Sequence, residues 1–258
     1  MTADAWIEVA RLSHDDLAVI VRGLDDEGLA RTSGSRQWDV AQVLGHLGSQ
    51  AEIGAATLQA ALGRQAPNGP EFNPQVWARW DALGRREKAD GFLRHSEELT
   101  RQYEQLDAAA RESLRIDLGF LPDADVATVL ALRVNELALH TWDVRVVDDP
   151  AATLLAPATA LLIDRFATLI GYIGHADALP SRPLTLAVDT TDPVRSFGLQ
   201  INDSVQVIDP PGRPGARVAL PSETWLRLIA GRLPSDRGSV RLDGPLRLED
   251  LQRVFPGF

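Results

Sequence analysis

Cysteine is absent from the 258 residues of this chain. Its absence excludes disulfides, iron–sulfur clusters, thiolate metal sites and a cysteine nucleophile, so any thiol chemistry needs a thiol from outside the chain. The sequence also lacks a run of about 18 uninterrupted apolar residues, which a membrane-spanning helix requires. The first 25 residues carry acidic side chains within a helical pattern, which predicts no signal peptide and a cytoplasmic protein.

Positive charge is scarce, and the net charge of the chain is -10. The first 150 residues hold 25 acidic and 15 basic residues, whereas the remainder holds 11 of each. An acidic surface repels phosphate groups, so we expect neither nucleic acid nor an anionic membrane as a partner. Glycine-rich phosphate loops and the Gly-x-Ser-x-Gly elbow are likewise missing.

The first half of the chain has the apolar spacing of α-helices. Asp39, with Gln42 three residues later, predicts the capped start of a helix that ends near Gly63. Asn73 and Pro74 are typical of the N-cap and first residue of another helix. The long helices are expected over 3–24, 39–63, 85–111 and 126–147, and their short connections predict an antiparallel four-helix bundle.

The second half of the chain changes character after Asp149-Pro150. One apolar helix is expected over 157–173, and helices that begin after Ser222 and near Leu248 are expected at the end. Alternating apolar residues predict strands over 184–188, 197–201, 205–208, 217–220 and 240–242. The predicted fold class is therefore α+β, with a helical bundle over 1–150 and a small α+β domain over 151–258.

Four ionisable residues form a stripe on the helix expected over 126–147: Arg133, Glu136, His140 and Asp143. Their spacing of i, i+3, i+7 and i+10 is that of the buried seam of a bundle. Unpaired charges in such a place cost several kcal/mol each in order-of-magnitude terms. The stripe therefore requires mutual pairing, partners from a second helix, or a metal ion.

Glu136 and His140 are four residues apart, so their side chains reach the same point above the helix. That geometry suits two ligands of a transition metal. The best candidate for a third ligand is His46, at the edge of the apolar face of the helix that Asp39 caps. Asp143 or Arg133 would then orient a ligand or a substrate. A structural salt-bridge network without metal is the competing interpretation of the same stripe.

For the other histidines and two tryptophans we expect structural roles and no part in the chemistry. His14, His95 and His175 stand in polar or loop segments and are expected at the surface. Trp38 precedes a helix cap and is expected to pack on the start of that helix. Trp142 points away from the stripe and is expected to have a packing role and no role in chemistry.

Two segments resemble a known family. Trp-Asp-Val-Ala-Gln-Val-Leu-Gly-His-Leu, over residues 38–47, is similar to the Trp-x-Val-x-x-Val-x-x-His-Leu signature of DinB-like bundles. Asn-Glu-Leu-Ala-Leu-His-Thr-Trp-Asp-Val, over 135–144, resembles the Glu-x-x-x-His-x-x-Asp motif of the mycothiol-dependent maleylpyruvate isomerases. The segment from Leu226 to Arg232 resembles the Leu-x-x-x-x-Gly-Arg helix of the C-terminal domain of that family. Asp243-Gly244 departs from the family, which has Gly-Asp there.

The resemblance implies a divalent metal, usually zinc, held by His46, Glu136 and His140, with mycothiol as the external thiol. In the characterised isomerase the thiol adds to a cis double bond, rotation follows, and elimination gives the trans product. Arg232 matches the arginine expected to bind the anionic substrate. We assign Arg232 and Asp143 to catalysis and Arg133 to binding of the cofactor.

The predicted function is that of a metal-dependent enzyme which uses a small thiol, either as an isomerase of an unsaturated acid or as a thiol S-transferase. Its expected partners are the thiol and a small anionic or electrophilic substrate, and the chain is expected to be a monomer or a homodimer. The alternative is a metal-stabilised binding or regulatory module without turnover. A salt-bridged bundle without metal is the third hypothesis, and it predicts that a chelator leaves thermal stability unchanged.

Overall fold

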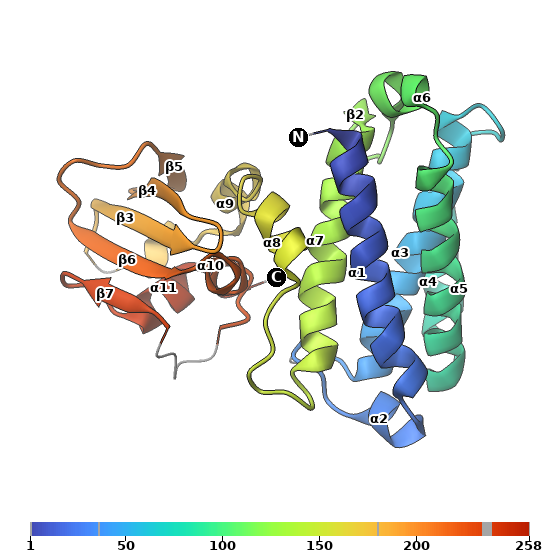
Figure 1. Cartoon of the computed structure of the whole chain (residues 1–258), viewed down its shortest axis with the longest axis horizontal. Coiled ribbons are helices and arrows are strands. Elements are labelled where there is room, and N and C mark those ends of the chain that lie inside the picture. Colours follow the sequence, from blue (N-terminus) through green and yellow to red (C-terminus); the bar gives the residue numbers. More distant parts are fainter. Residues whose placement is uncertain (1, 36, 180, 234–238, 258) are drawn as a thin grey trace. The chain divides into compact units, whose positions relative to one another are not determined.

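A computed structural model of the chain describes residues 2–35, 37–179, 181–233 and 239–257. The chain divides into two compact units, Met1–Ala152 and Thr153–Phe258. The first unit is helical and the second is built on a mixed sheet (Figure 1). The predicted α+β class, with an N-terminal helical bundle and a C-terminal α+β unit, is confirmed.

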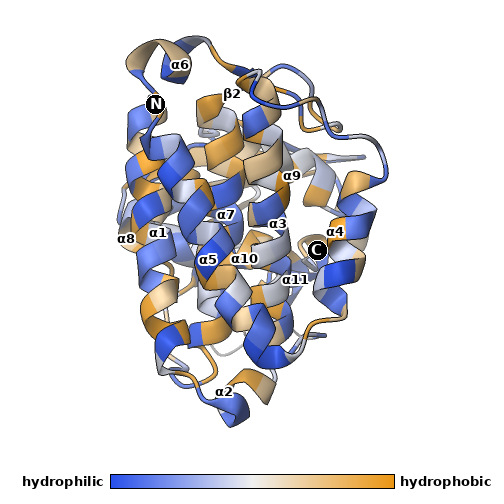
Figure 2. Cartoon of the chain, turned by 90° about the vertical axis from the view of Figure 1, so that its right-hand side faces the viewer, coloured by the Kyte–Doolittle hydropathy of each residue, from blue (hydrophilic) through white to orange (hydrophobic). Residues whose placement is uncertain are grey.

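The first unit consists of seven helices and a two-stranded ribbon among its described residues: α1 (Ala3–Gly23), α2 (Asp26–Ala30), α3 (Val40–Ala61), α4 (Phe72–Asp81), α5 (Arg85–Glu104), α6 (Ala108–Ser113), β1 (Arg115–Ile116), β2 (Ala124–Asp125) and α7 (Val126–Arg145). The four long helices α1, α3, α5 and α7 lie side by side (Figure 1). Hydrophobic and hydrophilic stretches alternate along them, as expected for helices that present one face to a core (Figure 2).

Local sequence explains where several of these helices begin. The side chain of Asp39 accepts a hydrogen bond from the backbone N–H of Gln42, and the Gln42 side chain accepts from the N–H of Asp39. The predicted capping box is thus confirmed. Asp125 caps α7 in the same way through the N–H of Thr128. These caps set the start of the two helices that carry the candidate site.

Two predicted boundaries in this unit were wrong. The helix predicted over 85–111 is two helices, because Asp107 accepts a hydrogen bond from the N–H of Ala110 and so starts α6. Glu71, and not Asn73, is the N-cap residue of α4.

The four long helices do not simply alternate in direction. Contacts between α3 and α5 advance together along both helices, from Gly45 with Lys88 to Gly54 with Leu99, so this pair is parallel. The short helix α4 returns the chain between them. Antiparallel pairing holds between α3 and α7 and between α1 and α5.

The core of the bundle is formed by buried apolar residues from every long helix. It includes Leu17, Val21, Val43, Leu44, Leu47, Phe92, Leu137 and Val144. This packing holds the backbones of α3 and α7 in place, which in turn determines where their polar side chains meet.

The second unit holds a five-stranded sheet in the order β5-β4-β3-β6-β7. Its elements are α8 (Ala156–Leu162), α9 (Ala167–Ile173), a 3-10 turn η1 (Ala176–Ala178), β3 (Leu184–Thr191), β4 (Arg195–Ile201), β5 (Val205–Ile208), β6 (Ala216–Pro221), α10 (Ser222–Ile229), β7 (Arg241–Asp243) and α11 (Leu248–Val254). Among the described strands of this sheet, β3 and β6 are parallel neighbours and the other pairs are antiparallel. The helix predicted over 157–173 is in fact two helices, α8 and α9.

Candidate metal centre

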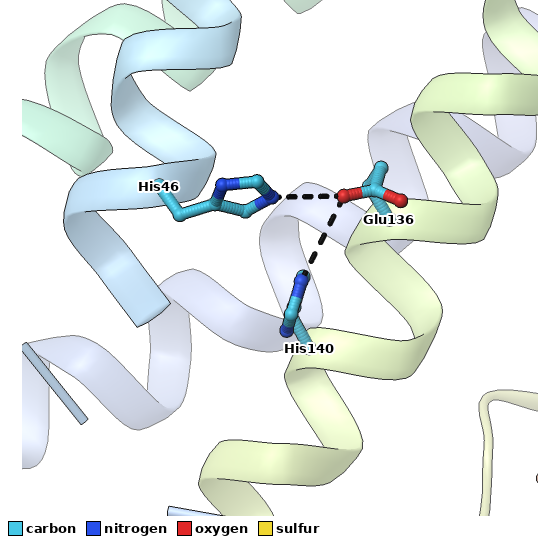
Figure 3. Close-up of side chains that lie close together, drawn as sticks. All are labelled: His46, Glu136 and His140. Carbon is cyan, nitrogen blue, oxygen red and sulfur yellow. Dashed lines mark hydrogen bonds and ion pairs between the residues drawn. The ribbon is translucent and has the colours of Figure 1, made fainter. Parts of the chain in front are cut away.

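Three of the predicted site residues come together where α3 faces α7. His46 projects from α3, whereas Glu136 and His140 project from successive turns of α7 (Figure 3). Because the two helices are antiparallel and their core residues interlock, these polar side chains meet at one level of the bundle. The three side chains point toward one another.

The distances within this cluster are short. Oε2 of Glu136 lies 3.0 Å from Nε2 of His46 and 3.7 Å from Nε2 of His140. One ligand atom from each residue can be chosen so that all three atoms lie within 4.8 Å of one another. A tetrahedral zinc ion with bonds of about 2.0–2.1 Å would separate its ligands by about 3.3 Å. The observed spacing is therefore close to that of a metal site.

Glu136 has the charge state that a metal ligand needs. Burial alone raises its pKa, but hydrogen bonds from His46 and Gln50 and the charges of His46 and His140 outweigh it and lower the pKa of Glu136 to about 2. The carboxylate is therefore ionised at neutral pH.

His140 is held by Asp143, which is fully buried one turn further along α7. Nδ1 of His140 donates to Oδ2 of Asp143 at 2.7 Å. A carboxylate can only accept, so Nδ1 carries a proton, and in the neutral form of His140 the lone pair of Nε2 faces the cluster. Metal-bound histidines are commonly oriented in this way.

The cluster is partly open to solvent. The side chains of His46 and Glu136 are 30% and 25% exposed, whereas that of His140 is 8% exposed. A small ligand from solvent can therefore reach two of the three side chains.

Arg133 lies beside the cluster and makes three hydrogen bonds to the protein. Its guanidinium donates to the carbonyl oxygen of Leu47 at 3.1 Å, to Oε1 of Gln50 at 3.3 Å and to Oγ of Ser96 at 3.1 Å. Burial lowers the pKa of Arg133 to about 10, against the opposing charge of Glu136, so the side chain stays charged at neutral pH. The role in cofactor binding assigned to Arg133 stays a prediction.

The contacts of Gln50 and Trp38 with the cluster were not predicted from the sequence. Nε2 of Gln50 lies 3.0 Å from Oε2 of Glu136 and 3.0 Å from Nε2 of His46. The ring of Trp38 packs on His46 and His140, with centroid distances of 5.0 and 5.9 Å. The position of Gln50, one turn after His46, was the available signal for the first residue. For Trp38 the signal was its place in the motif over 38–47.

His14 was expected at the surface, but it is 1% exposed. It lies at the helical spacing of Ala10, Leu17 and Val21, and therefore on the face of α1 that packs into the core. Its Nδ1 lies 2.9 Å from Oγ of Ser96 on α5. Of the other two histidines, His95 is half-buried and packs edge-on against a tryptophan ring, whereas His175 is exposed as predicted.

A second grouping of potential ligands, His14, Asp15 and Glu97, does not have the character of a metal site. Arg11 forms ion pairs with Asp15, Glu97 and Glu104 and supplies the positive charge that a cation would bring. Its hydrogen bonds lower the pKa of Glu97.

Arg232 belongs to the second unit and is half-buried just after α10. Its Nη1 donates to the carbonyl oxygen of Ala230 at 3.0 Å. Gly231, before it, has a φ of +68°, which allows the turn that ends α10.

A cavity of about 380 Å³ lies at the far end of α3, lined by residues that include Thr57, Asn73 and Arg115. None of the predicted site residues lines it, so the metal-like cluster is a separate feature.

The family of the chain is shown by a comparison with known proteins. The model of the mycothiol maleylpyruvate isomerase N-terminal domain matches residues 10–145, more than half of the chain. The chain belongs to the mycothiol-dependent maleylpyruvate isomerase family. The matched range runs from α1 to the end of α7 and contains His46, Glu136 and His140. The family resemblance inferred from the two motifs is confirmed.

Two solved structures share the fold. A crystal structure of the mycothiol-dependent maleylpyruvate isomerase superposes with a TM-score of 0.66 at 16% identity, and covers 94% of this chain and 93% of that one. A variant of that enzyme with one histidine replaced by alanine gives a TM-score of 0.67 at 15% identity, with the same coverage. No curated protein sequence gives a significant match. Among the described residues, no helix combines the length and apolar character needed to cross a membrane.

Proposed function

We propose that this protein is a metal-dependent enzyme that uses mycothiol to isomerise a small unsaturated acid. The observation that carries the proposal is the convergence of two imidazoles and one ionised carboxylate, from two facing helices, at the spacing of zinc ligands. His46, Glu136 and His140 would hold the metal. When bound, a zinc ion supplies a positive charge that lowers the pKa of a thiol.

The chain's own residues prepare the site for that metal. Asp143 keeps the Nε2 lone pair of His140 directed at the cluster, and the side chain of Trp38 packs on both imidazoles. The partial exposure of His46 and Glu136 gives a small thiol and a small acid access. Because the chain has no cysteine, the thiol must be external.

In the proposed reaction the thiol loses its proton, and the thiolate sulfur bonds to one carbon of a cis double bond while the π electron pair moves onto the conjugated carbonyl group of the acid. The former double bond then rotates as a single bond, and the electron pair returns from the carbonyl group on elimination. Elimination then breaks the carbon–sulfur bond and returns the thiol with the trans product, so no oxidant or reductant is consumed. Transfer of the thiol to an electrophile is the same first step without the elimination, which makes S-transfer the alternative reaction.

The substrate would carry a carboxylate, and we assign its binding to Arg232 of the second unit. Replacement of Arg232 by methionine should then raise KM for the acid more than it lowers kcat, with partial recovery for Arg232→Lys. Because the thiol is supplied by the cell, the proposed location is the cytoplasm. Sedimentation would decide between the monomer and the homodimer.

The test combines metal analysis with a turnover assay. Protein purified without a histidine tag should contain about one divalent ion per chain, and His140→Ala should lose it while His175→Ala, which changes an exposed histidine of the other unit, keeps it. Maleylpyruvate should isomerise only when mycothiol is present. Full metal occupancy in His140→Ala would contradict the site. Metal binding without thiol-dependent turnover, on maleylpyruvate or on an electrophile, would instead favour the binding module.

A further inference from the structure

We propose that Gln50 is a positioning residue for Glu136, and that Arg133 determines which end of the Gln50 amide faces the cluster. This inference rests on the proposed metal site. It assigns Gln50 the role of a hydrogen-bond donor beside the metal, in place of a fourth ligand.

Gln50 reaches the cluster from α3, one turn after His46. Its amide nitrogen lies 3.0 Å from Oε2 of Glu136. A glutamine amide has a donor end and an acceptor end of nearly the same shape, so either end fits the available space. With the nitrogen toward the cluster, Gln50 donates to Glu136. With the oxygen toward it, Gln50 would become a metal ligand.

Arg133 decides between these two orientations. Its guanidinium has only donors, and Nη1 lies 3.3 Å from Oε1 of Gln50. Reversal of the amide would bring its NH₂ group against Nη1 of Arg133, so that the N–H of Nη1 that now reaches Gln50 and the NH₂ group itself would face each other with no acceptor between them. The favoured state therefore keeps the amide nitrogen of Gln50 on Glu136.

Arg133 is itself fixed from two other helices. The carbonyl oxygen of Leu47 on α3 and the hydroxyl oxygen of Ser96 on α5 both accept from it. Ser96 is buried and bonded to His14 of α1, whose Nε2 lies 3.1 Å from Glu97. The guanidinium is thus held in place by the packing of the bundle. Its hydrogen bond to Gln50 in turn limits the movement of the Gln50 amide.

The consequence for the metal site concerns the carboxylate of Glu136. A donor on Oε2 limits the rotation of the carboxylate and keeps this oxygen directed between the two imidazoles. Hydrogen-bond partners of metal ligands typically contribute about 10–100-fold to metal affinity. Gln50 would account for a factor of this size here.

Gln50→Met tests the proposal, because methionine has a similar volume and no hydrogen-bond donor. We expect zinc affinity, measured by competition with a chromophoric chelator, to fall about 10–100-fold. The matched control is Gln59→Met in the same helix, since the side chain of Gln59 bonds to Gln102, away from the cluster. The control should bind zinc as the unchanged protein does.

The action of Arg133 through Gln50 is tested by a double-mutant cycle. Arg133→Met should weaken zinc binding, and the double variant with Gln50→Met should bind no more weakly than the weaker single variant. The visible spectrum of the Co²⁺-loaded Arg133→Met protein should differ from that of the unchanged protein, since the amide oxygen of Gln50 is then free to coordinate. Ser96→Ala removes one hydrogen-bond acceptor of Arg133 without a change at the cluster. If the Arg133→Met protein fails to fold, the cycle is measured with Ser96→Ala in its place.

The outcomes separate this proposal from the function on which it rests. Absence of zinc binding by the unchanged protein overturns both. Zinc binding that Gln50→Met leaves unchanged overturns only the role of Gln50, and additive losses in the double variant overturn the action of Arg133 through Gln50.

Discussion

Nδ1 of His140 donates to the buried carboxylate of Asp143 at 2.7 Å, and this bond sets which imidazole nitrogen faces the cluster. His140 and Asp143 lie one turn apart on α7, so the pairing is local to one helix and follows directly from the i, i+3 spacing. This hydrogen bond is sufficient to fix the tautomer of His140, so no other group is needed for that.

The first prediction concerns Asp143→Asn. An amide can turn its NH₂ group toward Nδ1, which would stabilise the tautomer with the proton on Nε2 and so block that nitrogen as a ligand. Zinc affinity should fall about 10–100-fold, with little change in the far-ultraviolet circular dichroism spectrum. Asp148→Asn, an exposed change near the end of the same helix, is the control. Equal zinc affinity in both variants would show that Asp143 does not orient His140.

The second prediction is a loss of stability on mild acidification that depends on His14. Burial lowers the pKa of His14 below its usual value of 6.5, Glu97 and Asp15 oppose this, and the charges of Arg11 and Arg133 add to it. The unfolded chain therefore binds a proton at a higher pH than the folded one. The contribution of neutral His14 to stability is complete above pH 6.5 and is lost as the pH falls from there toward the folded-state pKa.

Urea unfolding between pH 8 and pH 5 measures this effect. His14→Gln removes one titrating group and should make the decline of unfolding free energy over that range shallower. The part due to His95, whose pKa is also lowered by burial, should remain, and His175→Gln should leave the decline as steep as in the unchanged protein. The carboxylates do not interfere, because hydrogen bonds from Arg11 lower the pKa of Glu97 and Glu104 below the usual value of 4.5. A decline of equal slope in His14→Gln would mean that His14 is not the responsible group.

The helical spacing of the sequence predicted that His46, Glu136 and His140 come together, as they do in the structure, because their main contacts follow from local geometry. Glu136 and His140 had to share a face at i, i+4, and His46 lay at the edge of the core face of its own helix. The hydrogen-bond network around these three residues could not be predicted from the sequence. Gln50 and Ser96 are ordinary polar residues whose roles arise only when α3, α5 and α7 meet.

His14 shows why local context misled the prediction. It stands before Asp15 and Asp16, which indicates a solvated segment, yet the spacing of the apolar residues of α1 puts it on the buried face. Its polar atoms are satisfied by Ser96 and Glu97, two residues that lie more than 80 positions away in the sequence. Partners at such a separation have no signal in a helix pattern.

The third prediction concerns metal removal. Zinc that binds only the folded chain stabilises it by mass action, by about 2.7 kcal/mol at a free concentration 100 times Kd. For a chain of this size that corresponds to a rise in Tm of about 5–10 °C. A chelator should abolish the rise, and His140→Ala should show none. A melting temperature unaffected by zinc and by chelator would favour the salt-bridged bundle without metal.

The fourth prediction concerns the parallel pair α3 and α5, which the sequence analysis did not anticipate. The ring of Trp80 on α4 is 3% exposed and is accommodated by Gly48 of α3 and Gly91 of α5. A Cβ atom at Gly91 would lie 2.7 Å from Cη2 of Trp80, and one at Gly48 would overlap the same ring. Both glycines are therefore required by the close approach of a tryptophan to two helix backbones.

Two substitutions at this contact should be coupled. Gly48→Ala alone should lower the unfolding free energy by about 1–3 kcal/mol through overpacking, and Trp80→Ala by about 3–5 kcal/mol through loss of the buried ring. In the Trp80→Ala background the added methyl group meets no ring, and alanine favours the helix over glycine by about 0.5–1 kcal/mol, so Gly48→Ala should become neutral or stabilising. Gly54→Ala in the same helix, where the new methyl group meets only the flexible end of Leu99, is the control and should not destabilise. Chemical denaturation of the single and double variants measures the coupling, and a Gly48→Ala effect that is the same in both backgrounds would contradict the packing of Trp80 between α3 and α5.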